Sequence, residues 1–198
     1  ASESGSEVFK VDYFDRNAYL AQSPQFYKQM AMAAGFERIF ETGPVFRAEK
    51  SYTNKHSTEF SGFDLEFSYI TSFKDVMKME EELLTYMLKA VKEKYGEEIK
   101  ELFGKEVIVP TTPFPVIKLA DLYDELEKEF GYTVPDSEKG DLTTDAERLS
   151  YDWVMKKYGH EFLFITDYSA EKRAFYHMRD ENGVPQGYDL IWRGVEIT

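Results

Sequence analysis

The chain has 198 residues, 42% hydrophobic and 16% aromatic, which favours a folded domain with a core over disorder. Its formal net charge of −13 argues against a general nucleic-acid surface, although an acidic body can still carry a local basic patch. The absence of cysteine excludes disulfides and thiolate metal sites. Without a membrane-length apolar run or a leader peptide, we expect a cytoplasmic protein with no membrane partner.

The N-terminal segment is expected to contain extended chain followed by a helix. Residues 1–7 are small and polar and are typical of a frayed end. Alternation over residues 8–14 predicts a strand, followed by a turn at 15–17 and more extended chain. Ser23 as N-cap and Pro24 at the first helical position begin a helix.

Residues 46–67 predict a β-hairpin around which the rest of the chain is arranged. The hairpin places Arg47 and Glu49 on one face of its first strand, and Asp64 and Glu66 on one face of its second. The loop between them is polar and basic. A cation-rich loop beside a hairpin face that carries both acidic and basic side chains suits a ligand with a polyphosphate at one end and an ammonium group at the other.

Helices dominate the middle of the chain. Helical spacing of apolar residues predicts a long helix over residues 73–95, with Gly96 as its stop and a solvated charged face. A proline-punctuated connection follows, then a helix over residues 117–130 and a loop. Thr144 and Glu147 have capping-box spacing and predict a helix that ends near residue 158.

The C-terminal part reads as strands. Residues 161–166, 173–178 and 188–193 are strand candidates, and residues 180–183 are a hairpin turn. Hairpins and blocks of helices, without strict βα alternation, predict an α+β fold with an antiparallel sheet flanked by helices.

Two acids near the C-terminus suggest a metal site. Asp189 and Glu196 lie seven residues apart across Gly194, and on neighbouring strands their carboxylates would suit Mg²⁺. Solvated edge charges are the competing interpretation. The histidines lack zinc-like spacing, and neither a P-loop nor a catalytic-triad pattern is present. A site built from Arg, Lys and carboxylates favours nucleotide phosphates and electrostatic catalysis.

The motifs resemble those of a known family along nearly the whole chain. Residues 46–49, the basic loop and residues 59–66 resemble motif 2 of class II aminoacyl-tRNA synthetases. Residues 22–29 look like the aspartate-holding segment of aspartyl-tRNA synthetases of the archaeal type, and residues 2–9 resemble their mobile loop. Residues 187–198 resemble the family's metal-binding strands. The resemblance implies the class II synthetase-like catalytic fold, with a small helical insertion.

The resemblance also implies residue roles. Arg47 would bind the ATP α-phosphate and, with Glu49, serve catalysis. Asp189 and Glu196 would hold Mg²⁺. Lys28 would pair with the side-chain carboxylate of aspartate, which leaves the amide of asparagine badly matched. The other implied aspartate-binding residues are Glu3, Ser23, Gln25 and Asp64. The implied ATP-binding residues are Arg47, Glu49, Lys55, His56, Phe60 and Glu196.

The sequence departs from the family in several places. Gly62 stands where bacterial relatives carry a glutamine near the substrate. Motif 1, motif 3 and the anticodon-binding domain are missing from these residues, so we expect a fragment of a homodimeric parent, inactive or nearly so by itself. Residues 1–198 form one partial catalytic domain, divided into 1–106, an insertion at 107–160, and metal-site strands at 161–198.

The leading hypothesis is the catalytic core of an aspartate–tRNA ligase. It would use ATP and Mg²⁺ to form aspartyl-adenylate and pass the acyl group to the 3′ acceptor end of tRNA. One alternative is an asparaginyl-tRNA synthetase or an asparagine-forming paralogue. Another, of a different class, is a non-catalytic regulatory paralogue that has kept the fold.

Overall fold

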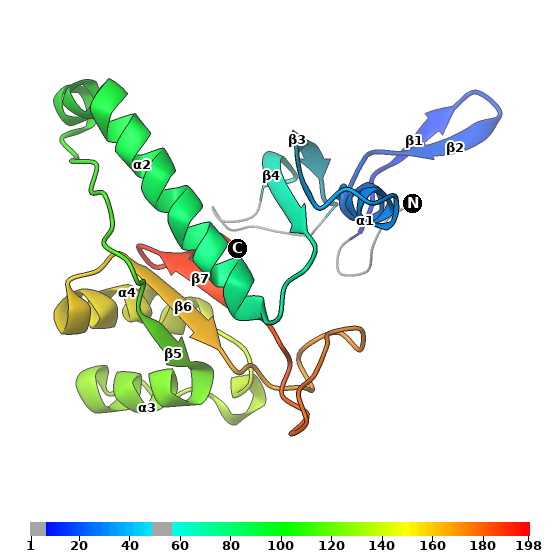
Figure 1. Ribbon diagram of the computed structural model, residues 1–198. Coiled ribbons are helices and arrows are strands. Elements are labelled where there is room, and N and C mark those ends of the chain that lie inside the picture. The colour runs from blue at the N-terminus through cyan, green and yellow to red at the C-terminus, as the bar shows by residue number, and fades with distance from the viewer. Residues whose placement is uncertain (1–6, 49–56) are drawn as a thin grey trace. The chain divides into compact units, whose positions relative to one another are not determined.

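The computed structural model describes residues 7–48 and 57–198. The chain divides into two compact units, Ala1–Ile70 and Thr71–Thr198, each of which is described by itself (Figure 1). None of the described helices combines the length and the apolar character that crossing a membrane requires.

The first unit consists of two antiparallel hairpins and one helix. Strands β1 (Lys10–Tyr13) and β2 (Arg16–Tyr19) form the first hairpin. Strands β3 (Arg38–Phe46) and β4 (Glu59–Phe67) form the second, and helix α1 (Gln25–Ala33) packs against both of its strands. The second hairpin confirms the predicted strand that contains Asp64 and Glu66, whereas the strand before the loop ends at Phe46, so Arg47 follows β3 and does not lie on it.

Two local predictions in this unit need correction. The turn of the first hairpin lies at Phe14 and Asp15, and β2 already begins at Arg16, so the predicted turn at residues 15–17 is displaced. Phe14 takes φ +51 in this turn. Helix α1 begins one residue later than predicted, with Pro24 as its N-cap residue, although Ser23 Oγ still accepts a hydrogen bond from Gln25 N at 3.1 Å.

The second unit is a four-stranded sheet between helices. The sheet order is β5-β6-β7-β8. In chain order, the helices and strands of this unit are α2 (Phe73–Phe103), β5 (Val116–Lys118), α3 (Leu119–Phe130), α4 (Thr144–Tyr158), β6 (Phe162–Thr166), β7 (Tyr188–Trp192) and β8 (Val195–Glu196). A short 3₁₀ helix spans Asp136–Glu138. The α+β class is confirmed. One pair, β5 with β6, is parallel, and the other pairs are antiparallel.

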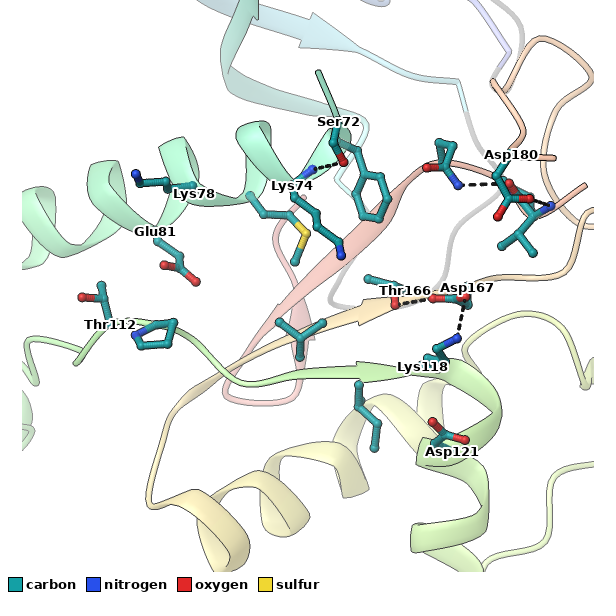
Figure 2. Close-up of a pocket in the computed structure, with 18 of the residues that line it drawn as sticks. Ser72, Lys74, Lys78, Glu81, Thr112, Lys118, Asp121, Thr166, Asp167 and Asp180 are labelled. Carbon is teal, nitrogen blue, oxygen red and sulfur yellow. Dashed lines mark hydrogen bonds and ion pairs between the residues drawn. The ribbon is translucent and has the colours of Figure 1, made fainter. Parts of the chain in front are cut away.

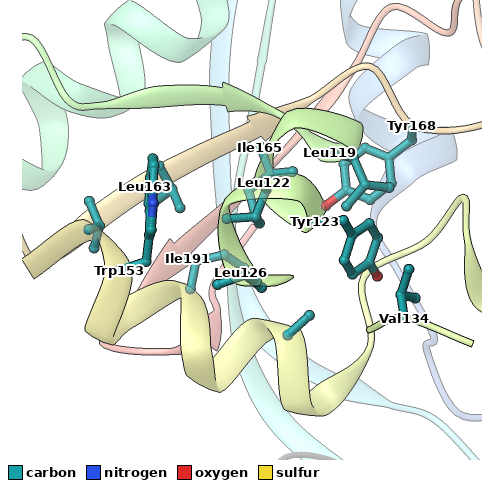
Figure 3. Close-up of a cluster of buried hydrophobic side chains, with 12 residues drawn as sticks. Leu119, Leu122, Tyr123, Leu126, Val134, Trp153, Leu163, Ile165, Tyr168 and Ile191 are labelled. Atoms are coloured by element: carbon teal, nitrogen blue, oxygen red, sulfur yellow. The ribbon is translucent and has the colours of Figure 1, made fainter. Parts of the chain in front are cut away.

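Alternating residues of β6 and β7 separate two hydrophobic cores. Leu163, Ile165 and Ile191 face α3 and α4, where they join the larger cluster (Figure 3). Phe162, Phe164 and Leu190 point to the other face, where they pack with Met77 of α2 and with Phe114. The period-2 alternation of a strand therefore gives this sheet two buried faces, with α2 on one side and α3 and α4 on the other (Figure 1).

The end of α2 and the start of α4 differ from the predictions. Gly96 lies inside α2, which continues to Gly104, where a left-handed φ of +62 ends it. A single helical glycine costs only about 1 kcal/mol, so flanking helical residues can carry the helix past it. Thr143, not Thr144, caps α4 by accepting a hydrogen bond from Ala146 N.

Residues 173–178 do not form the predicted strand. They lie in turns, and the nearby pairing is the isolated bridge between Arg179 and Pro185. Phe175 is 92% exposed, so the alternating pattern does not cover a core here. The predicted turn at residues 180–183 is confirmed, with Asp180 Oδ1 accepting hydrogen bonds from Asn182 N and Val184 N.

Leu122 offers a test of the larger core. It is fully buried, and Leu122→Ala is expected to lower the free energy of unfolding by about 2–5 kcal/mol, because it removes buried methyl groups and leaves a cavity. Leu102→Ala is the matched control, since Leu102 is 65% exposed and its loss should cost less than about 0.5 kcal/mol. Urea unfolding of the two variants measures the difference, and equal losses would contradict the assigned core.

Candidate active site

The register of β3 and β4 brings the predicted hairpin residues to one face. Val45 lies opposite Phe60, Gly43 opposite Gly62, and Glu41 opposite Asp64. Since side chains alternate along a strand, these positions share a face with Glu66. Arg47 follows two residues after Val45, and its backbone N donates to Thr58 O at 3.1 Å, which extends the pairing beyond β3. The predicted grouping of Asp64 with Glu66 is confirmed.

Lys28 is buried in an ion-pair network with this face. Its side chain is 6% exposed, and its Nζ lies 2.9 Å from Asp64 Oδ1 and 3.6 Å from Glu66 Oε2. α1 positions the ammonium group because Lys28 lies on the helix face that packs on β3 and β4. A buried ammonium with carboxylate partners is a costly arrangement that stability alone does not require. It fits a site that binds a carboxylate.

A small pocket lies beside the network. Its volume is about 240 Å³, and its lining includes Ser23, Tyr27, Glu41, Gly43 and Asp64. The two carboxylates, Glu41 and Asp64, are cross-strand partners. Glu41 and Tyr27 were missed by the sequence reasoning. Glu41 could be identified from its position opposite Asp64 in the strand register. That register can be assigned only once the length of the hairpin turn is known. Such a pocket suits a small ligand that carries an ammonium group.

Arg47 lies at the end of the hairpin beside Phe60. Its guanidinium carbon is 5.4 Å from the centre of the Phe60 ring. Its Nε is buried, and among the described residues it has no hydrogen-bond partner. A buried donor without a partner costs free energy, so a ligand acceptor at this place is chemically favourable. The predicted site residues Glu3, Glu49, Lys55 and His56 lie outside the described residues.

In the second unit, Asp189 is held by an arginine. Arg173 Nη2 lies 2.9 Å from both Oδ1 and Oδ2 of Asp189, and the guanidinium stacks 3.9 Å from the centre of the Tyr168 ring. Burial raises the pKa of Asp189, and Tyr168 and Arg173 partly oppose this rise. Arg173 was missed because it lies in the segment that was predicted as a strand.

Glu196 lies on β8, opposite Ile191 of the neighbouring strand β7. Its backbone N donates to Glu147 Oε1 of α4 at 2.6 Å. Desolvation, followed by the neighbouring charges of Asp189 and Glu147, raises the pKa of Glu196 to about 7, although part of the side chain stays exposed. Two carboxylates that repel each other are a suitable oxygen donor set for Mg²⁺, which needs one or two protein carboxylates beside phosphates and water. Among the described residues there is no cluster of three or more such ligands.

The raised pKa predicts how stability depends on pH. Between about pH 4.5 and pH 7, the unfolded chain releases a proton that folded Glu196 retains, so this residue lowers stability as the pH rises through that range. Glu196→Gln should therefore lose less stability than the wild type between pH 4.5 and pH 7.5. Urea unfolding in magnesium-free buffer measures the free energy of unfolding at each pH. Glu101→Gln, at an exposed position, is the control. An equal loss in wild type and Glu196→Gln would contradict the assigned environment.

The second unit also contains a larger groove of about 1060 Å³. It lies between the first turns of α2, strand β5 and the turn after Asp180, and it carries both signs of charge, with Lys74, Lys78 and Glu81 on α2 (Figure 2). Lys118 pairs with Asp167 at 3.2 Å on its lower wall. None of the predicted site residues lines this groove.

Comparisons with known proteins agree on one family. A family model described as tRNA synthetases class II (D, K and N) matches residues 1–198. The aspartate–tRNA(Asp/Asn) ligase of Aeropyrum pernix is 42% identical over 200 residues, which is 100% of this chain and 45% of that relative. The chain thus spans less than half of the relative's length.

Solved structures give the same result. The aspartyl-tRNA synthetase of Entamoeba histolytica is 34% identical, with a TM-score of 0.80 over 90% of this chain and 37% of that one. The asparaginyl-tRNA synthetase of Pyrococcus horikoshii, complexed with asparaginyl-adenylate, is 33% identical, with a TM-score of 0.81 over 99% of this chain and 44% of that one.

Proposed function

The chain belongs to the class II tRNA synthetases of the D, K and N group, and we propose that the protein containing it is an aspartate–tRNA ligase. The observation that carries the proposal is the buried ammonium group of Lys28, 2.9 Å from Asp64 and beside a pocket with two carboxylates. Aspartate has the complementary charges: a side-chain carboxylate for Lys28 and an α-ammonium group for Asp64 and Glu41. The pocket volume suits an amino acid.

In the proposed reaction, the α-carboxylate of aspartate attacks the α-phosphorus of ATP, and pyrophosphate leaves. Arg47 stabilises the negative charge that develops on the α-phosphate, because its buried Nε, at the end of the hairpin, finds no hydrogen-bond partner in residues 7–48 and 57–198. Lys28 and Asp64 hold the amino acid in the orientation for attack. Ser23 lines the pocket just before α1. Gln25, the first residue of α1, is outside the pocket lining and is assigned to the amino-acid side by the family resemblance alone.

The remaining assignments extend this proposal. Glu49 orients the substrates, Lys55 and His56 bind the outer phosphates, and Phe60 stacks on adenine. Glu3 receives the ammonium group of the substrate or orders its neighbours. Asp189 and Glu196 would hold Mg²⁺, and the ion would supply neutralisation of phosphate charge. We expect the full-length protein to be a homodimer. We also expect it in the cytoplasm, where ATP and tRNA are both present.

A second candidate function is asparaginyl-tRNA synthesis. The similarity to a structure complexed with asparaginyl-adenylate supports it at the level of the fold. Lys28 argues against it, because a buried ammonium group prefers a carboxylate to a neutral amide. A non-catalytic paralogue would also keep the fold, but it would have no need for the costly burial of Lys28.

Aminoacylation by the full-length protein tests the proposal. With ATP, Mg²⁺ and tRNA, labelled aspartate should become attached to the 3′ end of tRNA, and labelled asparagine should not. Charging with asparagine alone would favour the second candidate. Free asparagine formed from aspartate and ammonia would indicate the asparagine-forming paralogue. No reaction with either amino acid would favour the non-catalytic paralogue.

A further inference from the structure

Gly62 occupies a tightly enclosed place on the hairpin. A Cβ atom at this position would lie 3.0 Å from Asp64 Oδ2 and 3.3 Å from Val45 Cγ2. Its backbone does not require the left-handed region, so glycine is not needed there for its conformation. At Gly43, directly across the strand pair, an added Cβ would meet nothing within 4 Å. The two opposed glycines therefore differ in their surroundings. A side chain at position 62 would have to displace neighbouring atoms, whereas one at position 43 would not.

Each neighbour of Gly62 makes contacts that a displacement would disturb. Val45 is buried, with 6% of its surface exposed. Asp64 is held from its other side, where Oδ1 accepts a hydrogen bond from Lys28 Nζ at 2.9 Å. The carboxylate of Asp64 thus fills the space between the backbone at position 62 and the ammonium group of Lys28. A methyl group at position 62 would push Oδ2 away and turn Oδ1 from Lys28.

We propose that Gly62 is a positioning residue for the amino-acid site: its missing side chain lets Asp64 lie against the strand and hold Lys28 in place. This inference rests on the proposed function, because it assigns Lys28 and Asp64 to aspartate. When Asp64 is displaced, Lys28 keeps Glu66 as a more distant partner, at 3.6 Å, and its ammonium group moves toward it.

The functional test is a double-mutant cycle in the full-length protein. Gly62→Ala should raise KM for aspartate in ATP–pyrophosphate exchange about 10-fold, with a smaller effect on kcat, because displacements below 1 Å already weaken a preorganised site. Because Gly62 acts through Asp64, the double variant Gly62→Ala/Asp64→Ala should be no worse than Asp64→Ala alone. Additive effects, or a KM within twofold of the wild type in Gly62→Ala, would overturn the proposal.

Gly96→Ala supplies the comparison. It adds the same methyl group to a glycine inside α2, outside the lining of the amino-acid pocket, where the new Cβ would meet only Lys92 Cγ at an ordinary 3.5 Å. Its effect on KM should therefore be smaller than that of Gly62→Ala and should add to that of Asp64→Ala. An equal effect of the two glycine substitutions would overturn the role of Asp64.

A crystal structure of the Gly62→Ala variant separates this inference from the proposed function. The distance from Lys28 Nζ to Asp64 Oδ1 should increase from 2.9 Å by a few tenths of an ångström, whether or not the protein activates aspartate. An unchanged distance would overturn the inference. If the wild type shows no aspartate-dependent exchange, the proposed function fails, while the lengthened distance would still support the steric role of Gly62.

Discussion

Replacing Arg47 by alanine is expected to lower kcat of aspartate-dependent ATP–pyrophosphate exchange by about 10³-fold, with little change in KM for aspartate. Arg47 lies apart from the Lys28 network, at the end of the hairpin, and its buried Nε has no partner among the described residues. The charge it meets in the proposed reaction develops on the α-phosphate in the transition state. Its loss should therefore affect kcat more than amino-acid binding.

The geometry of the guanidinium makes this prediction specific. Arg47→Lys keeps the positive charge but loses the planar fork, so it should recover only a small part of the rate. Arg38→Ala is the matched control, since Arg38 is exposed at the start of β3, the strand that Arg47 follows. A kcat within threefold of the wild type in Arg47→Ala would show that the residue has no catalytic role.

Replacing Lys28 by leucine is expected to lower kcat/KM for aspartate by about 10³-fold, because one partner of a buried charge pair is removed and the substrate carboxylate is left unpaired. The effect on asparagine should be much smaller, so the preference for aspartate should collapse. Leucine has a similar size but no charge, and it leaves Asp64 and Glu66 facing an apolar group.

Lys89→Leu is the control for this loss. Lys89 is 65% exposed and lies 4.0 Å from Glu93, an arrangement that contributes little. It should leave exchange unchanged. If Lys28→Leu kept the wild-type ratio between aspartate and asparagine, the assignment of the amino-acid pocket would be wrong.

Much of the first unit could be predicted from local patterns. Alternating apolar and acidic residues over residues 63–67 identify β4, and the basic loop separates it from β3. The two strands place Asp64 and Glu66 on one face because strand geometry has a period of two. The family resemblance implied that Lys28 and Asp64 both bind aspartate, but it did not imply their ion pair, which depends on the packing of α1 on the hairpin.

The features that could not be predicted depend on contacts between distant residues. Arg173 lies in a segment whose alternation resembles a strand, yet its guanidinium reaches Asp189 and Tyr168 instead. The hydrogen bond from Glu196 N to Glu147 joins β8 to α4, which no local pattern indicates. The close approach at Gly62 likewise depends on where Asp64 is held by Lys28, and a bare glycine in a strand does not reveal it.

The most direct test of the account is ATP–pyrophosphate exchange by the full-length protein with aspartate and asparagine as competing substrates. The buried ammonium group of Lys28 predicts a kcat/KM for aspartate at least about a hundredfold above that for asparagine. Equal values, or a preference for asparagine, would contradict it.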